Sequence, residues 1–213
     1  MARHNLLQGD LSDHVSVAVA ALKDGYVIVA PLENSYALVA DAFFHDAVRA
    51  LHVLRGDALG VAAQVVIASK SSIDGIARSI PDEARTLMDK FWPGALSINL
   101  KPQLGLTWDL GDANSLDQIS VRVPSSEFIL EVLKKTGPLV IASAAACGAP
   151  AINNEADLAF SDVEAAAVFT AGVLTQGAPS TVVDFTGSKS RILRAGAIPQ
   201  SEITALVSDI SGD

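Results

Sequence analysis

The apolar run from Tyr26 to Ala30 constrains the fold more than any other stretch of the sequence. It contains no charged side chain, so a strand at this place must be covered on both of its faces. An amphipathic helix is predicted just before it, over residues 12–23, and Gly25 suits the position after the helix ends. The inward face of this helix is formed by residues at helical spacing, Val15, Ala18, Val19 and Leu22. A helix that leads into a buried strand is typical of layered α/β proteins.

The same alternation of helices and strands continues along the rest of the chain. Further helices are predicted at residues 41–54, 73–79, 81–91, 125–135, shortly after 154, and 200–208. Further strands are predicted at residues 36–40, 61–68, 95–100, 119–123, 139–143, 166–170, 173–175, 180–185 and 191–194. Residues 101–117 are predicted to form a long surface loop. Without an internal repeat or a low-complexity linker, the sequence predicts a single α/β domain over residues 1–213, with a mixed sheet flanked by helices.

Composition argues against several classes of protein. Half of the 213 residues are hydrophobic and 18% are charged, which argues against a disordered chain. The formal net charge of −9 disfavours nucleic acid and anionic membranes as partners. Cys147 is the single cysteine, so no intrachain disulfide or cysteine-based zinc site is expected, and we expect Cys147 to be a small buried residue. No apolar run reaches the ~18 residues of a membrane span and no signal-type segment is recognised, so we expect a cytoplasmic protein.

Residues that could carry chemistry gather where predicted strands end. No Walker A, GxGxxG, HExxH or GxSxG motif is found and the histidines lack ligand-like spacing, so no metal site is predicted. What remains is a set of arginines and hydroxyl residues near strand ends: Arg55, Arg122, Ser143, Ser180, Thr181 and Arg194. Arginine together with hydroxyl groups is the combination that binds phosphate or carboxylate. Any one of these residues alone is more often an ordinary surface residue, so the prediction rests on their shared place in the fold.

Several of these stretches together resemble the YrdC-like family, which includes the threonylcarbamoyl-AMP synthases and their YciO-type relatives. The most specific match is Phe91-Trp-Pro-Gly-Ala-Leu-Ser97, which resembles the family's Phe-Trp-Pro-Gly-Pro-Leu-Thr segment. The other matching segments, in the family's order, are Gly25 to Asp41, Val121-Arg-Val-Pro124, Ser180 to Asp184 and Leu193 to Ile198. The likeness extends over residues 13–198, where we expect the core of the domain.

This resemblance implies a twisted mixed sheet around a concave cleft. Active members of the family condense ATP, threonine and bicarbonate, release pyrophosphate and supply a threonylcarbamoyl modification of tRNA adenosine. Some members are described as binding double-stranded RNA. The resemblance therefore implies ATP as a ligand, and it also allows for Mg²⁺ bound together with the ATP. The ligand-binding residues that the resemblance implies in this chain are Ser35, Arg55, Arg122, Ser143, Ser180 and Arg194.

The chain also departs from the family's motifs. A family Lys-x-Arg pair is compared with Val53-Leu54-Arg55, which puts Val53 in place of the lysine. The asparagine of a Ser-x-Asn motif is replaced by Ala145, and a threonine of the opening segment is replaced by Leu32. A charge-assisted phosphate contact is worth about 1.5–3 kcal/mol, and the contacts of one catalytic site act as a unit. These departures predict weakened or altered chemistry.

Three hypotheses follow. In the first, the chain keeps a cleft for a nucleotide or another small anion and has lost or altered the family's chemistry. In the second, it is a divergent but active threonylcarbamoyl-AMP synthase. In the third, it is a double-stranded RNA-binding module, which the acidic net charge disfavours unless the arginines gather on one surface: Arg49, Arg55, Arg122, Arg191 and Arg194. No membrane partner is expected, and nothing in the sequence sets an oligomeric state.

Overall fold

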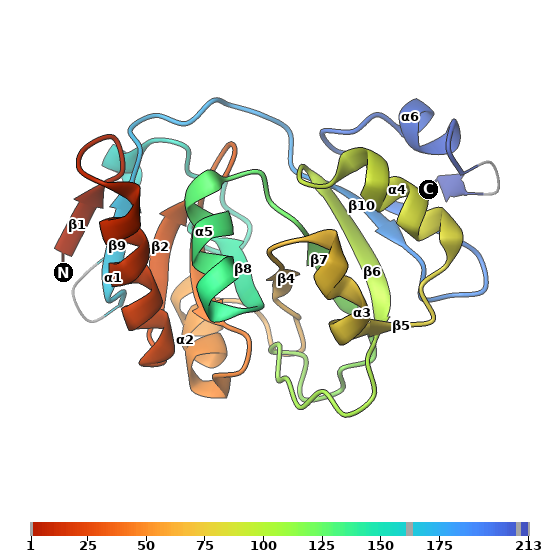
Figure 1. Ribbon diagram of the computed structural model, residues 1–213, viewed down its shortest axis with the longest axis horizontal. Coiled ribbons are helices and arrows are strands. Elements are labelled where there is room, and N and C mark those ends of the chain that lie inside the picture. The colour runs from red at the N-terminus through yellow and green to blue at the C-terminus, as the bar shows by residue number, and fades with distance from the viewer. Residues whose placement is uncertain (1, 161–163, 208–209, 213) are drawn as a thin grey trace.

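A mixed β-sheet extends from one end of the structure to the other (Figure 1). The structure is a computed structural model that describes residues 2–160, 164–207 and 210–212. The strands lie in the order β1 (Ala2–Asn5), β9 (Ala167–Thr170), β2 (Ile28–Pro31), β3 (Tyr36–Asp41), β8 (Leu139–Ser143), β4 (Gln64–Val66), β7 (Ile119–Arg122), β6 (Leu96–Pro102), β10 (Thr181–Asp184), β11 (Arg191–Arg194) and β12 (Ser211–Gly212). A short strand, β5 (Ala77–Arg78), pairs with β6 beside this path. The predicted α/β domain with a mixed sheet is confirmed.

Helices cover both faces of this sheet. Helices α1 (Leu11–Lys23) and α5 (Glu127–Thr136) pack against each other and share one apolar core with β2, β3, β8 and β9 (Figure 1). Helices α2 (His45–Arg55) and α4 (Asp82–Phe91) belong to the second, larger core, in which α2 contacts β3 and β8 and α4 contacts β6. Alternation along a strand explains the two cores, because Val39 belongs to the first and its neighbours Leu38 and Ala40 to the second. Among the described residues, the other α-helices, α3 (Ile73–Ile76) and α6 (Gln200–Thr204), are short, and two 3₁₀ helices lie at Lys70–Ser72 and Glu155–Asp157.

Beyond β8, the face that α1 and α5 cover changes from apolar to polar. Val66 on β4 still contacts the α1–α5 core, whereas Gln64, on the same side of that strand, does not belong to it. The register of β4 with β7 places Arg122 beside Val66 on this face. The Gln64 amide donates hydrogen bonds to the Ser97 hydroxyl at 2.6 Å and to the Ser120 hydroxyl at 3.3 Å. A polar strip across β4, β7 and β6 thus continues the face that is apolar beneath the two helices.

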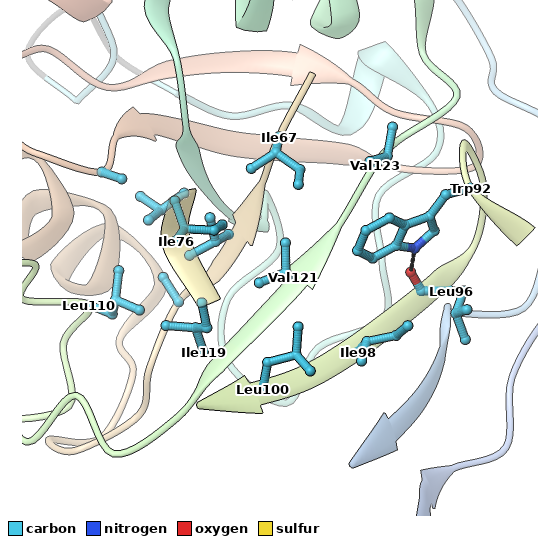
Figure 2. Packing of buried hydrophobic residues seen from close by; sticks show 14 of the residues in the cluster. Ile67, Ile76, Trp92, Leu96, Ile98, Leu100, Leu110, Ile119, Val121 and Val123 are labelled. Atoms are coloured by element: carbon cyan, nitrogen blue, oxygen red, sulfur yellow. Dashed lines mark hydrogen bonds between the residues drawn. The ribbon is translucent and has the colours of Figure 1, made fainter. Parts of the chain in front are cut away.

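The larger core, part of which is drawn in Figure 2, includes Trp92 of the Trp-Pro-Gly segment between α4 and β6. Trp92 has only 8% of its surface exposed, and its indole N–H donates a 2.8 Å hydrogen bond to the backbone oxygen of Leu96 (Figure 2). Trp92 is therefore a core residue. A Cβ atom at Gly94 would lie 2.6 Å from the backbone oxygen of Phe91, so this turn requires glycine.

Most predicted elements are present with shifted bounds, and the shifts have local causes. The helix predicted from residue 41 begins at His45, because Asp41 completes β3 and its carboxylate accepts a 2.9 Å hydrogen bond from the Phe43 backbone N–H. The helix predicted over residues 73–79 ends at Ile76, where the chain enters β5 and pairs with β6. Tertiary pairing decides both boundaries, and periodicity alone does not report it.

One predicted strand is wrong, and three short strands were not predicted, namely β5, described above, and β1 and β12. Val173, in the strand predicted over residues 173–175, makes only an isolated bridge with Asn154. Strands β1 and β12 pair in parallel with β9 and β11, and neither has the apolar alternation that would reveal a strand. The helix predicted over residues 200–208 is observed as α6, and residue 208 lies outside the described residues.

The loop between β6 and β7 is more closely attached to the domain than predicted. Trp108 and Leu110 are buried, so residues 101–117 are not simply a surface loop. Two histidines of α2 contact its backbone, since His45 Nε2 lies 2.8 Å from the Thr107 oxygen and His52 Nε2 lies 2.8 Å from the Leu110 oxygen. Among the helices of the described residues, none combines the length and apolarity needed to cross a membrane.

Candidate functional site: a cationic cleft on the sheet

A cleft of about 630 Å³ lies on the polar part of the sheet. Its walls come from the turn after β2, the end of α2 with the segment that follows, the ends of β7 and β8, and the chain around β10 and β11. The six ligand-binding residues that the resemblance implies all line this one cleft: Ser35, Arg55, Arg122, Ser143, Ser180 and Arg194. Thr181, which the sequence also placed at a strand end, is not a lining residue, because it is buried and its hydroxyl donates a 2.7 Å hydrogen bond to the Ile198 oxygen. The fold therefore brings together side chains that are up to 159 positions apart in the sequence. Their roles in binding remain predictions.

Arg122 and Glu33 form an ion pair in one wall of the cleft. Arg122 ends β7, its side chain is 8% exposed, and its guanidinium donates a hydrogen bond to Glu33. The other carboxylate oxygen of Glu33 accepts hydrogen bonds from the Ser125 backbone N–H at 2.6 Å and from its hydroxyl at 3.1 Å. Burial acts to raise the pKa of Glu33, but the charge of Arg122 and the Ser125 N–H outweigh it and hold that pKa below its usual value. The buried Nε of Arg122 has no hydrogen-bond partner among the described residues.

Arg194 and Ser180 form a second corner. Arg194 donates hydrogen bonds of 2.9 Å to the backbone oxygen of Ser180 and to its hydroxyl. The Ser180 hydroxyl lies 2.9 Å from that of Ser97, which joins this corner to the polar strip on the sheet. Burial and the positive charge of Arg122 both lower the pKa of Arg194, so the two guanidinium groups act on each other. In the part of the chain that the structure describes, no carboxylate forms an ion pair with Arg194, and its charge is available to an anion.

Arg55, Asp57 and His52 form a cluster at a third corner. Arg55 ends α2, and its Nε donates to both carboxylate oxygens of Asp57 at 3.0 Å while Nη1 donates to the Ser143 backbone oxygen at 3.1 Å. His52 Nδ1 lies 2.9 Å from Asp57, and its other ring nitrogen contacts Leu110. Burial acts to raise the pKa of Asp57, but the hydrogen bonds from His52 and Arg55 outweigh it and hold that pKa below its usual value. The cluster ties the end of α2 to β8 and to the loop before β7.

The two remaining predicted serines occupy turns at the cleft. The Ser143 hydroxyl accepts a 3.2 Å hydrogen bond from the Ala145 backbone N–H. The Ser35 backbone oxygen accepts a 2.9 Å hydrogen bond from the Leu32 N–H, which closes the turn after β2. The apolar part of the lining includes Leu32, Ala37, Val61, Ala63 and Ile141. The cleft therefore combines charged corners with an apolar surface, as small-molecule sites usually do.

Two of the departures found in the sequence do not lie in the cleft lining. Val53 is 78% exposed and is not a lining residue, and the interpretation of Val53 as the position of a missing phosphate cation stays a prediction. Ala145 is buried and is not a lining residue either. Leu32 does line the cleft, so the missing hydroxyl there belongs to the site. Cys147, which was expected to be buried, is exposed, and its backbone N–H donates a 2.8 Å hydrogen bond to the Arg55 oxygen.

Sequence reasoning missed both acidic residues of the cleft. A signal existed for Asp57, because an acid two positions from a predicted anion-binding arginine is placed to pair with it. Glu33 lies two positions before Ser35, in a turn that was already predicted to line the site. Gln64 gave no signal, because the predicted strand over residues 61–68 did not reveal which of its faces would meet the cleft.

The arginines do not gather into a basic surface. Arg49 contacts Asp46 and Asp109, and Arg191 contacts Asp184. Arg55 and Arg122 are largely buried and also pair with carboxylates. The condition that would have favoured RNA binding is therefore not met by these side chains, and RNA binding stays a prediction.

The fold and the cleft together define a class of protein. Three arginines and two carboxylates line the cleft, which leaves one arginine charge in excess. Within the described ranges, no group of three or more His, Cys, Asp or Glu side chains is arranged to hold a metal ion. The chain is thus an α/β protein whose sheet carries an open cleft suited to a small organic anion.

Comparison with known proteins identifies the family within this class. The Sua5/YciO/YrdC family model, described as "Telomere recombination", matches residues 20–196. A Mycobacterium tuberculosis protein, provisionally named threonylcarbamoyl-AMP synthase, is 36% identical over 191 residues, which are 89% of this chain and 87% of that protein. A Mycobacterium leprae protein with the same provisional name is 37% identical over 194 residues, 91% of this chain and 87% of the relative. The chain belongs to the Sua5/YciO/YrdC family.

Solved structures share the fold. Pyrococcus abyssi Sua5 in complex with L-threonine superimposes with a TM-score of 0.88 at 25% identity and covers 100% of this chain. The chain spans 62% of that protein's length. Escherichia coli YciO has a TM-score of 0.79 and covers 95% of this chain and 97% of its own, and at 21% identity this likeness shows the fold alone.

Proposed function

We propose that the cleft binds an adenine nucleotide together with a small amino acid, and that the family's synthase chemistry is altered in this chain. The observation that carries the proposal is the corner formed by Arg194, Ser180 and Arg122. There an arginine that pairs with no carboxylate of the described residues lies beside a hydroxyl and a second guanidinium. Guanidinium and hydroxyl donors are the groups that hold a phosphate or a carboxylate.

The relatives indicate which anions to consider. The Mycobacterium proteins carry the name threonylcarbamoyl-AMP synthase, and the Pyrococcus abyssi structure is a complex with L-threonine. An adenylate and an amino acid are accordingly the ligands we propose here, and a role in tRNA modification follows if the chemistry is retained in any form. The apolar lining around Leu32 and Ile141 would face the less polar parts of such ligands.

The cleft offers no obvious protein ligands for Mg²⁺. Its two carboxylates, Glu33 and Asp57, each form an ion pair with an arginine. A Mg²⁺ ion prefers oxygen ligands and usually reaches such sites with the phosphates of a nucleotide. We therefore propose no Mg²⁺ site formed by the side chains of this cleft.

Binding and product formation test the proposal separately. Calorimetric titration with AMP and with ATP should show saturable binding to the wild-type protein. Binding should be about ten- to a hundredfold weaker for Arg194→Gln, because one charge-assisted contact is lost. Arg191→Gln removes an arginine of the same strand that is not in the cleft lining, and should bind as the wild type does.

Product formation decides whether the chemistry is altered. ATP, L-threonine and bicarbonate are incubated with the protein and the products are separated by mass spectrometry, with the Mycobacterium tuberculosis relative assayed in parallel. We expect less threonylcarbamoyl-AMP from this chain than from an active relative. Equal yields would contradict the altered chemistry, and absence of binding by the wild-type protein would contradict the proposed function as a whole.

A further inference from the structure

The arginine at the end of α2 is neutralised within the cleft. Gly56 adopts a left-handed conformation (φ +67°) and ends the helix, which turns the chain so that Asp57 meets the side chain of Arg55. The Asp57 side chain is only 3% exposed, and that of Arg55 is 18% exposed. The Asp57 carboxylate and the Arg55 guanidinium therefore face each other with little contact with solvent.

Asp57 is held by more than one donor. Both of its oxygens accept from Arg55 Nε, and one of them also lies 2.9 Å from His52 Nδ1. His52 is itself held, because its other nitrogen contacts the Leu110 oxygen at 2.8 Å. Arg55 also donates to the Ser143 oxygen, which orients the guanidinium. The Arg55 charge is thus shared with a fixed protein carboxylate before any ligand arrives.

The corner with Arg55 and the corner with Arg194 therefore differ in net charge, because Asp57 neutralises Arg55. Arg194 has no carboxylate partner among the described residues, and it lies close enough to Arg122 for each charge to affect the other. Ser143 ends β8 and Ser180 precedes β10, which are four strand spacings apart, about 19 Å along a flat sheet at ~4.8 Å per spacing. Both arginines nevertheless line the same cleft, so the further phosphates of a nucleotide bound at Arg194 would extend toward Arg55, whose charge Asp57 already neutralises.

We propose that Asp57 determines specificity in the cleft by neutralising Arg55, so that the cleft prefers a nucleoside carrying a single phosphate over one carrying a triphosphate. This inference rests on the proposed function, since it concerns the same site and the same class of ligand. Asp57 acts through Arg55, whose charge it neutralises, and is not a catalytic residue. The preferred ligand would be an adenosine monophosphate or an adenylate ester of the same charge.

The test measures binding of AMP and ATP to four proteins by calorimetry without Mg²⁺. The wild type should bind AMP at least as tightly as ATP. Asp57→Asn frees Arg55 and removes a negative charge, so ATP binding should tighten about ten- to a hundredfold while AMP binding changes less than about threefold. Asp74→Asn is the matched control, because it removes a carboxylate from an Asp–Arg pair that is exposed and outside the cleft lining. In the double variant Asp57→Asn/Arg55→Gln, the gain in ATP binding should disappear.

The outcomes separate this inference from the proposed function. Wild-type binding with no selective gain for ATP in Asp57→Asn overturns the inference and leaves the proposed function intact. ATP bound more than tenfold tighter than AMP by the wild type also overturns it, and this result needs no variant. If the wild type binds neither nucleotide and Asp57→Asn gains nothing, both fail. Circular dichroism checks the fold, and Asp57→Ala, which leaves no buried amide, repeats the test if Asp57→Asn does not fold.

Discussion

Removing the charge of Glu33 should destabilise the protein, because Glu33 is the counter-ion of the buried Arg122. Glu33 accepts hydrogen bonds from Arg122 and from both donors of Ser125, so it connects the turn after β2 to the segment after β7. Glu33→Gln keeps the size of the side chain and one acceptor oxygen but removes the negative charge. Arg122 would then remain as a buried cation without a counter-ion.

The expected loss follows from the burial of the pair. Breaking a buried ion pair by removing one partner costs about 3–5 kcal/mol. The Glu33 side chain is 23% exposed and the glutamine oxygen can still accept one hydrogen bond, so we expect about 2 kcal/mol. For a chain of this length, that loss corresponds to a fall in Tm of about 4–8 °C.

Urea unfolding at pH 7, followed by circular dichroism, measures the change in the free energy of unfolding. Glu131→Gln is the control, because Glu131 pairs with Lys134 on an exposed helix face and should cost at most about 0.5 kcal/mol. The folded pKa of Glu33 lies below its usual value of 4.5, so the stabilisation by its charge is present above that value and is lost as the pH falls through the folded pKa. The difference in the free energy of unfolding between the wild type and Glu33→Gln should therefore disappear at acidic pH. Equal costs for the two variants at pH 7 would refute the reasoning.

Three further predictions concern the cleft and the attached loop. Arg194→Gln should raise the Kd for AMP about ten- to a hundredfold by calorimetry, and an unchanged Kd would place the anion elsewhere. Val53→Lys should leave that Kd within about twofold, because residue 53 is exposed and outside the lining, and a gain in affinity would restore it as a site position. Gly111→Ala should cost more than about 2 kcal/mol in urea unfolding, since the glycine has φ +94° and the new Cβ would lie 2.2 Å from His52 Nε2. A cost near zero would show that the loop moves freely.

Much of the fold could be predicted because local pattern and tertiary structure agree. The apolar run at β2 and the helical spacing in α1 were sufficient to place a buried strand under a helix. Polar or very short strands could not be found this way, as β1 and β12 show, because their pairing depends on a neighbour that is remote in the sequence. The bridge at Val173 illustrates the converse, since an apolar segment without a partner strand forms no strand.

The sequence predicted the arginines of the candidate site but not the two carboxylates that set its net charge. Arg122 and Arg194 could be recognised together because strand ends converge, and the structure places them on one cleft with Arg55, which ends α2. Whether an arginine is free or neutralised depends on side-chain geometry, which distinguishes Arg194 from Arg55. The motif comparison suggested lost charge at Val53, whereas the structure shows a charge retained at Arg55 and balanced by Asp57.

The strand order also sets when the cleft can exist during synthesis. Glu33, Arg55 and Arg122 belong to the first part of the chain, but β10 inserts between β6 and β11 only after residue 184 has been made. The corner with Ser180 and Arg194 is thus among the last parts of this domain to be synthesised. Until then, the polar strip with Gln64 and Ser97 lies at an open edge of β6. A nucleotide that needs this corner cannot assist the folding of the nascent chain, and can stabilise only the finished domain.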